Sequence, residues 1–168
     1  MEAHKLEEIF AQFNHQKILV VGDVMVDSYI WGSVTRISPE APVPIVQVQK
    51  RESRLGGAAN VALNLQALGA SPVLCTVIGD DQRGKEFLEL CMTRNLTIDG
   101  ILQSPERITT IKERIMSGSQ HIVRIDHETD QVLNNSDRDK LVNTFRTLID
   151  GCHAVVFQDY DKGSLSES

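Results

Sequence analysis

Two adjacent glycines, Gly56 and Gly57, stand directly before a helix-forming segment that places Asn60 in its first turn. Glycine has no Cβ, so a ligand can come close to the backbone at this pair. A helix N-terminus presents unpaired N–H groups and the positive end of the helix dipole. Together these features predict a site for a polar or anionic small molecule. The alternative is a tight turn at the start of a well-packed helix, and these residues alone leave it open.

A second group of polar residues follows the first apolar run of the chain. Gly22 and Asp23 come at its end, and Asp27 follows shortly after. Open α/β sheets bind ligands beyond the carboxyl ends of their parallel strands. There, Asp27 could accept hydrogen bonds from two neighbouring hydroxyl groups, as sugar recognition requires. Residues 79–84 (Gly-Asp-Asp-Gln-Arg-Gly) follow the next apolar run, where they read equally well as a helix N-cap.

Hydrophobic periodicity predicts the elements that would position these residues. Continuous apolar runs are typical of strands buried on both faces. Such runs occupy 17–22, 72–79 and 154–157, and helical spacing occupies 3–14, 58–69, 83–94 and 137–149. Ser136 and Asp139 are the predicted N-cap and N3 residues of the last helix. Strands that alternate with helices predict an α/β fold whose parallel sheet is covered by helices on both faces.

Other segments alternate apolar and polar residues, which is typical of strands with one face in water. They lie at 29–36, 43–50, 111–116 and 120–126. They predict a second, smaller sheet made of two insertions, at about 29–50 and 109–126. Its apolar side chains favour a homodimer through this sheet, since a two-fold contact buries one patch against its own copy.

Composition restricts the function classes. The chain has 168 residues, as expected of one domain, and a net charge of −6 without any basic block, which argues against nucleic acid as a partner. No apolar run approaches the roughly 18 residues that a membrane span needs. Cys75, Cys91 and Cys152 are widely spaced and form no metal motif, so we expect free thiols in the reducing cytoplasm and no metal site.

Taken in order, these motifs resemble the N-terminal half of the ribokinase (PfkB) family of carbohydrate kinases. The resemblance runs from about residue 16 to 165, and the glycine-pair helix resembles the first signature of that family. Three segments make the chain similar to the heptose-7-phosphate kinase branch, which includes the kinase part of bifunctional heptose kinase/adenylyltransferases. They are residues 36–45, 109–112 and 159–163.

The resemblance implies a ribokinase-like, three-layer parallel-sheet core with a small β-sheet lid that closes over the sugar. In such kinases the matching residues hold the sugar, and ATP and Mg²⁺ are the cofactors. The implied sugar-binding residues are Asp27, Gly56, Gly57 and Asn60. A phosphorylated sugar also needs cations, for which Arg54, Lys112, Arg114 and Arg124 are candidates. A solvated strand face is the alternative for the last three. Lys162 is a candidate for a sugar or ATP phosphate, with an exposed loop lysine as its alternative.

One departure from the family pattern is large. The family's second signature, Asp-Thr-x-Gly-Ala-Gly-Asp, does not occur in the 168 residues. That signature supplies the catalytic base and the N–H groups around the transferred phosphoryl group, and phosphoryl transfer depends on such positioning. We therefore assign no catalytic residue. Residues 164–167 also predict the start of a helix, so the chain is expected to stop inside a larger domain.

Two functions remain open at this stage. The first is part of an ATP-dependent kinase that phosphorylates D-glycero-D-manno-heptose 7-phosphate at its anomeric hydroxyl, for nucleotide-heptose and lipopolysaccharide synthesis. The 168 residues alone are then expected to be inactive. The second is a non-catalytic sugar-binding or dimerisation module. A dinucleotide oxidoreductase is disfavoured, because no G-x-G-x-x-G follows the first strand.

Overall fold

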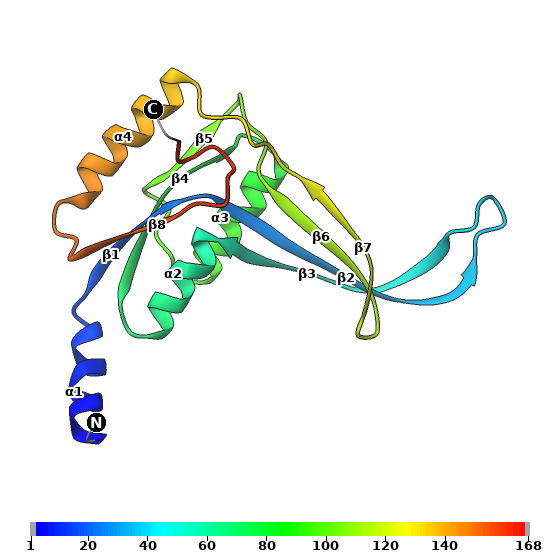
Figure 1. Ribbon diagram of the computed structural model, residues 1–168, viewed down its shortest axis with the longest axis horizontal. Coiled ribbons are helices and arrows are strands. Elements are labelled where there is room, and N and C mark those ends of the chain that lie inside the picture. Colours follow the sequence, from blue (N-terminus) through cyan, green and yellow to red (C-terminus); the bar gives the residue numbers. More distant parts are fainter. Residues whose placement is uncertain (1–2, 167–168) are drawn as a thin grey trace.

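The computed structural model describes residues 3–166, which form two four-stranded sheets (Figure 1). The central sheet is parallel, in the order β5-β4-β1-β8. Its strands are β1 (Lys17–Gly22), β4 (Ser71–Gly79), β5 (Ile101–Ser104) and β8 (Ala154–Gln158). The lid sheet is mixed, in the order β3-β2-β6-β7. Its strands are β2 (Val24–Ile37), β3 (Pro44–Gly57), β6 (Ile111–Ser117) and β7 (Gln120–His127).

Helices cover both faces of the central sheet. Val20 of β1 packs in one core cluster with α2 (Ala58–Ala67) and α3 (Gln82–Thr93). Its neighbours in the strand point to the other face and pack with α4 (Asn135–Ile149). This alternation follows from the period of two along a strand, and it explains why the whole run is apolar. The three-layer α/β core predicted from the sequence is therefore confirmed.

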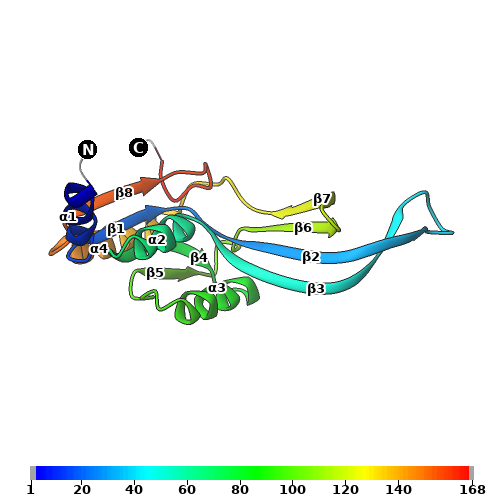
Figure 2. The same ribbon diagram turned by 90° about the horizontal axis from the view of Figure 1, so that it is seen from below.

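The lid extends from this core as two long strands. Figure 2 shows β2 and β3 running out past the core, away from the end that carries α1 (Ala3–Phe13). β2 follows β1 directly, and β3 leads directly into α2. A residue near the core end of β2 or β3 is therefore held at the carboxyl edge of the central sheet.

Several sequence-based boundaries need correction. The first lid hairpin spans Val24 to Gly57 rather than 29–50, because its core end is buried on both faces and does not alternate. Strand β5 was not predicted. The N-cap of α4 is Asn134, whose side chain accepts from the N–H of Asp137, and not Ser136. No helix begins between 164 and 166, and Glu167 lies outside the described residues.

Two apolar surfaces are open in the part of the chain that the structure describes. On α1, Ile9 and Phe10 are exposed. No described strand pairs with the outer edge of β8, where Phe157 is 61% exposed. Beside it lies an apolar groove of about 280 Å³, lined by Phe145, Phe157 and Leu165 among others. Between residues 3 and 166, no helix combines the length and hydropathy that a membrane span requires.

Candidate functional site

One face of the lid sheet carries the predicted site residues in a row across four strands. Arg54 of β3, Asp27 of β2, Lys112 of β6 and Asp126 of β7 occupy paired positions. Side chains at paired positions share one face of a sheet. The structure thus brings three predicted residues together, and the row alternates positive and negative charge.

The carboxylate of Asp27 lies against the glycine pair. A Cβ added to Gly56 would be 2.4 Å from Asp27 Oδ2. A Cβ added to Gly57 would be 2.4 Å from the backbone oxygen of Asp23, and Gly57 has a φ of +60°, which favours glycine. Both glycines are therefore required where β3 passes into α2. Asp27 itself is partly exposed and lies within β2, not in a loop.

The remaining two predicted residues approach from outside the lid. Asn60 is exposed in the first turn of α2, whose N-cap Gly57 offers no side-chain hydrogen bond to that turn. The N–H of Ala58 donates to the backbone oxygen of Asp23 at 2.8 Å. Lys162 lies in the loop after β8. The site is thus assembled at the carboxyl edge of the central sheet, from the lid, one helix N-terminus and one loop.

Arg114 of β6 is the direct partner of Asp27. Its Nη1 donates to Asp27 Oδ1 at 2.6 Å and to the backbone oxygen of Lys112 at 3.2 Å. The guanidinium carbon also lies 5.2 Å from the ring centroid of Tyr29. Sequence reasoning named Arg114 as one of several cations but missed this contact, because the pairing of β2 with β6 cannot be read from the sequence.

An aromatic pair lies at the centre of the same face and was also missed. Tyr29 and Trp31, two residues apart on β2, stack with ring centroids 5.2 Å apart. Arg54 lies over Tyr29 at 4.9 Å, and Lys50 lies over Trp31 at 4.8 Å. Lys50 and Arg54 both bond Glu52, and these bonds lower the pKa of Glu52 to about 2.

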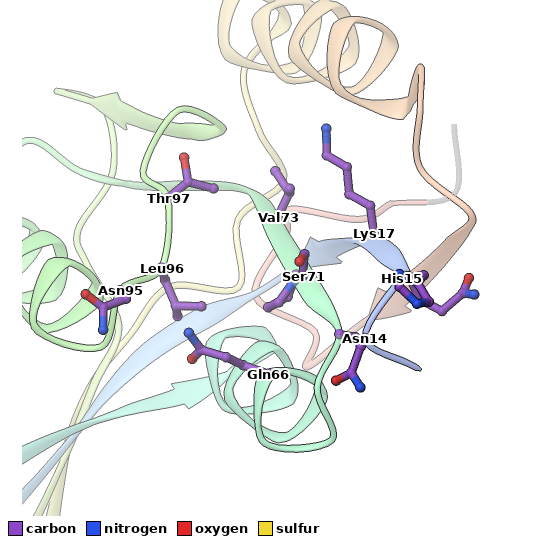
Figure 3. A pocket seen from close by; sticks show the side chains of 12 residues that line it. Asn14, His15, Lys17, Gln66, Ser71, Val73, Asn95, Leu96 and Thr97 are labelled. Carbon is purple, nitrogen blue, oxygen red and sulfur yellow. The ribbon is translucent and has the colours of Figure 1, made fainter. Parts of the chain in front are cut away.

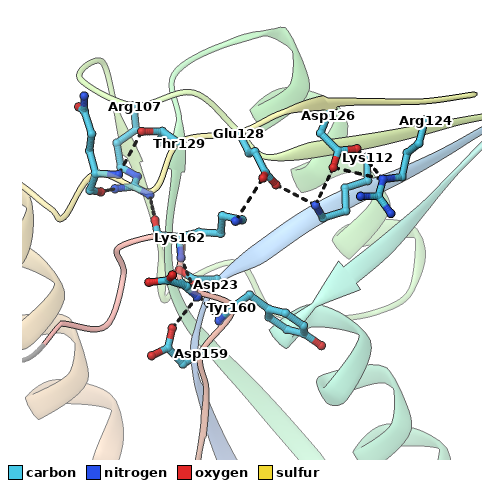
Figure 4. Close-up of polar contacts among 12 residues, drawn as sticks. Asp23, Arg107, Lys112, Arg124, Asp126, Glu128, Thr129, Asp159, Tyr160 and Lys162 are labelled. Atoms are coloured by element: carbon cyan, nitrogen blue, oxygen red, sulfur yellow. Dashed lines mark hydrogen bonds and ion pairs between the residues drawn. The ribbon is translucent and has the colours of Figure 1, made fainter.

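A chain of ion pairs connects the lid to the loop after β8 (Figure 4). Glu128 accepts from Lys112 Nζ at 2.8 Å and pairs with Lys162 Nζ at 3.3 Å. Lys112 also pairs with Asp126, which Arg124 contacts in turn. The hydrogen bonds from Lys112 and Lys162 lower the pKa of Glu128 below its usual 4.5. Both predicted phosphate ligands on this side therefore share one carboxylate, and Lys112 has Asp126 as a second partner.

Asp23 holds the loop that carries Lys162. Its side chain is buried, with an exposed fraction of 2%. Its two oxygens accept from the backbone N–H groups of Tyr160, Lys162 and Ser164 at 2.9 to 3.1 Å. A buried carboxylate that accepts from three backbone N–H groups of one loop fixes that loop. Asp23 is thus structural and orients the edge of the site.

Two further cavities lie away from the row of charged residues on the lid. The first, of about 430 Å³, is at the amino ends of β1 and β4 and shares no residue with the predicted site (Figure 3). Asn14, Lys17 and Gln66 are among its lining residues. The second, of about 320 Å³, lies on the α3 side of the lid, between Asp81 and His127. The first cavity lies at the edge of the sheet opposite to the carboxyl edge, where this fold class binds ligands, and the second, just beyond the end of β4, shares no residue with the site around Asp27.

Possible metal ligands are scattered over the part of the chain that the structure describes. Between residues 3 and 166, no three His, Cys, Asp or Glu side chains are grouped so that they could hold a metal ion. The acidic residues nearest the site are already paired with Arg or Lys. Each of these carboxylates would have to leave its Arg or Lys partner before it could bind a Mg²⁺ ion.

The chain is similar in sequence to known proteins over most of its length. The profile of the pfkB family carbohydrate kinases matches residues 15–164. The bifunctional protein HldE of a Helicobacter pylori strain is 49% identical over 150 residues, which are 89% of this chain and 32% of that protein. HldE of Trichlorobacter lovleyi is 41% identical over 168 residues, which are 100% of this chain and 34% of that protein. The chain thus spans about a third of the length of these curated relatives.

Solved structures agree on the fold. A carbohydrate kinase from Agrobacterium tumefaciens superposes with a TM-score of 0.56 at 17% identity, over 84% of this chain and 53% of that one. At such identity the likeness concerns the fold alone. It confirms the ribokinase-like arrangement of a parallel sheet and a mixed lid sheet.

Proposed function

Because this chain belongs to the pfkB family of carbohydrate kinases, we propose that residues 1–168 form the sugar-binding part of an ATP-dependent sugar kinase. The proposed substrate is D-glycero-D-manno-heptose 7-phosphate, phosphorylated at the anomeric hydroxyl for nucleotide-heptose and lipopolysaccharide synthesis. The relation to HldE supports this substrate class.

The contact between Asp27 and Gly56 carries the proposal. A Cβ on Gly56 would lie 2.4 Å from a carboxylate oxygen, so only glycine at this position leaves room for Asp27, an acceptor of two hydroxyl hydrogens. This combination is what a vicinal diol needs. It lies at the carboxyl edge of the sheet, where the fold class binds its ligands.

Cations around Asp27 suit an anionic substrate. Arg114, Arg54 and Lys112 lie on the same lid face, and Lys162 approaches from the core. Each of these four cations is paired with a carboxylate of the protein itself. A phosphate group can replace such a carboxylate as the acceptor of a charged hydrogen bond without loss of charge balance.

The proposal extends to cofactor, location and assembly. ATP would approach the edge that carries Lys162, and the transferred phosphoryl group needs an N–H cradle and a base that these residues do not supply. The three free cysteines accord with a cytoplasmic protein. A homodimer through the apolar face of the lid remains part of the proposal.

Two measurements test the proposal. Calorimetry on the complete natural polypeptide that contains these residues should show binding of heptose 7-phosphate, and its absence would refute the proposal. In a coupled ADP-release assay, residues 1–168 alone should show no turnover. The predicted inactivity is refuted if residues 1–168 show turnover and one point mutation within them abolishes it. Sugar binding by a complete polypeptide without any turnover would instead support the non-catalytic module.

A further inference from the structure

The acceptor that the proposed sugar needs is occupied by the protein itself. Arg114 Nη1 lies 2.6 Å from Asp27 Oδ1, and Oδ2 faces the backbone at Gly56. The two side chains are only 20% and 23% exposed. A diol that approaches Asp27 therefore competes with Arg114 for Oδ1, through a short, charged hydrogen bond that is largely shielded from water.

No other ion pair on this lid face has that consequence. Lys112 pairs with Asp126 and Glu128, and Lys50 pairs with Glu52. None of those three carboxylates touches the glycine pair in the described structure. Arg114 is thus the cation whose position decides whether Asp27 can accept hydroxyl groups.

Arg114 can leave Asp27 without leaving the site. It lies one row further from the core than Asp27, since it pairs with Tyr29 while Lys112 pairs with Asp27. Rows on one face of a strand are about 6.6 Å apart. The guanidinium already lies beside the face of Tyr29, which belongs to that outer row. A phosphate bound further out on the lid would therefore meet Arg114 at short range.

We propose that Arg114 makes the site selective for phosphorylated sugars, by occupying Asp27 until the phosphate of the substrate draws it away. This inference rests on the proposed function. With the phosphate bound, Arg114 exchanges one anionic partner for another and Asp27 becomes free for the hydroxyl groups. A sugar without phosphate breaks the same ion pair but offers Arg114 no anionic partner in place of Asp27. Binding of phosphate and binding of sugar are thus coupled, and the coupling is reciprocal.

The test compares two variants: one removes the cation that pairs with Asp27, and the other removes a cation that pairs with Glu52. Arg114→Met keeps an unbranched stem beside Tyr29 but removes the donors. Lys50→Met is the matched control, because Lys50 also combines one ion pair with one aromatic contact on this face. Calorimetry on the complete natural polypeptide measures heptose 7-phosphate, the same heptose without phosphate, and that heptose in the presence of inorganic phosphate.

The unmodified protein should bind heptose 7-phosphate roughly tenfold or more tightly than heptose. Inorganic phosphate should tighten its binding of heptose. Arg114→Met should weaken binding of heptose 7-phosphate by a similar factor, leave or improve binding of heptose, and abolish the effect of inorganic phosphate. Lys50→Met should retain the original preference.

Arg114→Lys gives a second reading if the methionine variant does not fold. It keeps the charge without the forked donors and should show an intermediate preference. The inference is overturned if the variants keep the original preference, or if they lose both sugars to the same degree. If the unmodified protein binds neither sugar, the proposed function itself fails, and that outcome is distinct from a lost preference.

Discussion

Asp27 and Gly56 are in direct contact across β2 and β3: a Cβ on Gly56 would lie 2.4 Å from Asp27 Oδ2. The contact is possible only because position 56 carries a hydrogen atom in place of a side chain. It fixes the position of a charged acceptor at the core end of the lid, and the proposed sugar site depends on it.

Gly56→Ala should therefore displace Asp27 and weaken sugar binding. The new methyl group would also meet the side chain of Met25, 2.7 Å away, so the strand has no direction in which to yield. We expect at least tenfold weaker binding of heptose 7-phosphate by calorimetry. Gly118→Ala is the control: it changes a glycine in the turn between β6 and β7, where nothing lies within 4 Å of the Cβ position and the strain from a φ of +59° stays in the turn. Equal affinity in the two variants would contradict the prediction.

Asp27→Asn should weaken sugar binding and spare ATP binding. An amide replaces one acceptor oxygen by a donor, and the loss of a charged hydrogen bond costs about 1.5–3 kcal/mol. Glu113→Gln is a matched control, because Glu113 is a lid carboxylate with a similar exposed fraction and a nearby arginine, Arg83. Its strand partner is Ser28, the residue after Asp27 on β2, from which it accepts a hydrogen bond. Unchanged sugar affinity in Asp27→Asn would show that Asp27 only shapes the strand.

Asp137 should make stability sensitive to acid. Hydrogen bonds from Ser104 (2.5 Å) and Asn134 (2.9 Å) lower its pKa below the usual 3.8. A carboxylate with a lowered folded-state pKa stabilises the fold above about pH 4, and this contribution is lost as the pH falls through the lowered pKa. Asp137→Asn should cost about 1–3 kcal/mol at pH 7 and flatten the loss of stability below pH 4.

Urea unfolding of the complete natural polypeptide at pH 7 and pH 3 measures this difference. Asp99→Asn serves as the control, because Asp99 is exposed and bonds only its neighbour Thr97 in the described structure. The prediction fails if Asp137→Asn loses as much stability between the two pH values as the unmodified protein does.

Elements with one dominant pattern could be predicted from the sequence. The run at 17–22 matches β1 at both ends, because every residue faces a helix layer or a neighbouring strand. The glycine pair before α2 was likewise readable as a motif, although the residues that require it, Asp23 and Asp27, lie far away in the sequence. Asn60 was named from its place in the first turn after the glycine pair, and Lys162 from its place after the third apolar run; the roles of both stay predictions.

Features that depend on long-range pairing were not readable. Strand β5 has four residues and no distinctive pattern, and it exists because it pairs with β4. The bond between Asp27 and Arg114 joins residues 87 positions apart and requires β2 and β6 to run parallel. Ser136 was predicted as the N-cap, whereas Asn134 caps α4; both residue types cap helices well, so residue type alone does not locate the cap.

The apolar face of the lid should mediate a homodimer. Val48 and Val123 are 48% and 47% exposed, on the face opposite Asp27. A two-fold contact would bury this patch against its own copy. Val123→Glu should therefore yield monomers in light scattering of the complete natural polypeptide at tens of micromolar, while Lys50→Met on the polar face should not. A monomeric unmodified protein would refute the prediction.

The open edge of β8 should make residues 1–168 associate when they are prepared alone. An unpaired parallel strand offers free N–H and C=O groups, and Phe157 adds an apolar side chain that is 61% exposed. Parallel sheets are ordinarily covered on both faces, so the groove beside Phe157 adds to the effect.

Phe157→Lys should reduce this association, because charge on an edge strand opposes pairing with another chain. Met92→Lys is the control: Met92 is 53% exposed, but it lies on α3, which has no free backbone groups to pair. Sedimentation of both variants measures the difference. If residues 1–168 unfold cooperatively as a monomer with several kcal/mol of stability, the four-stranded sheet is sufficient by itself, and the exposed edge carries no such cost.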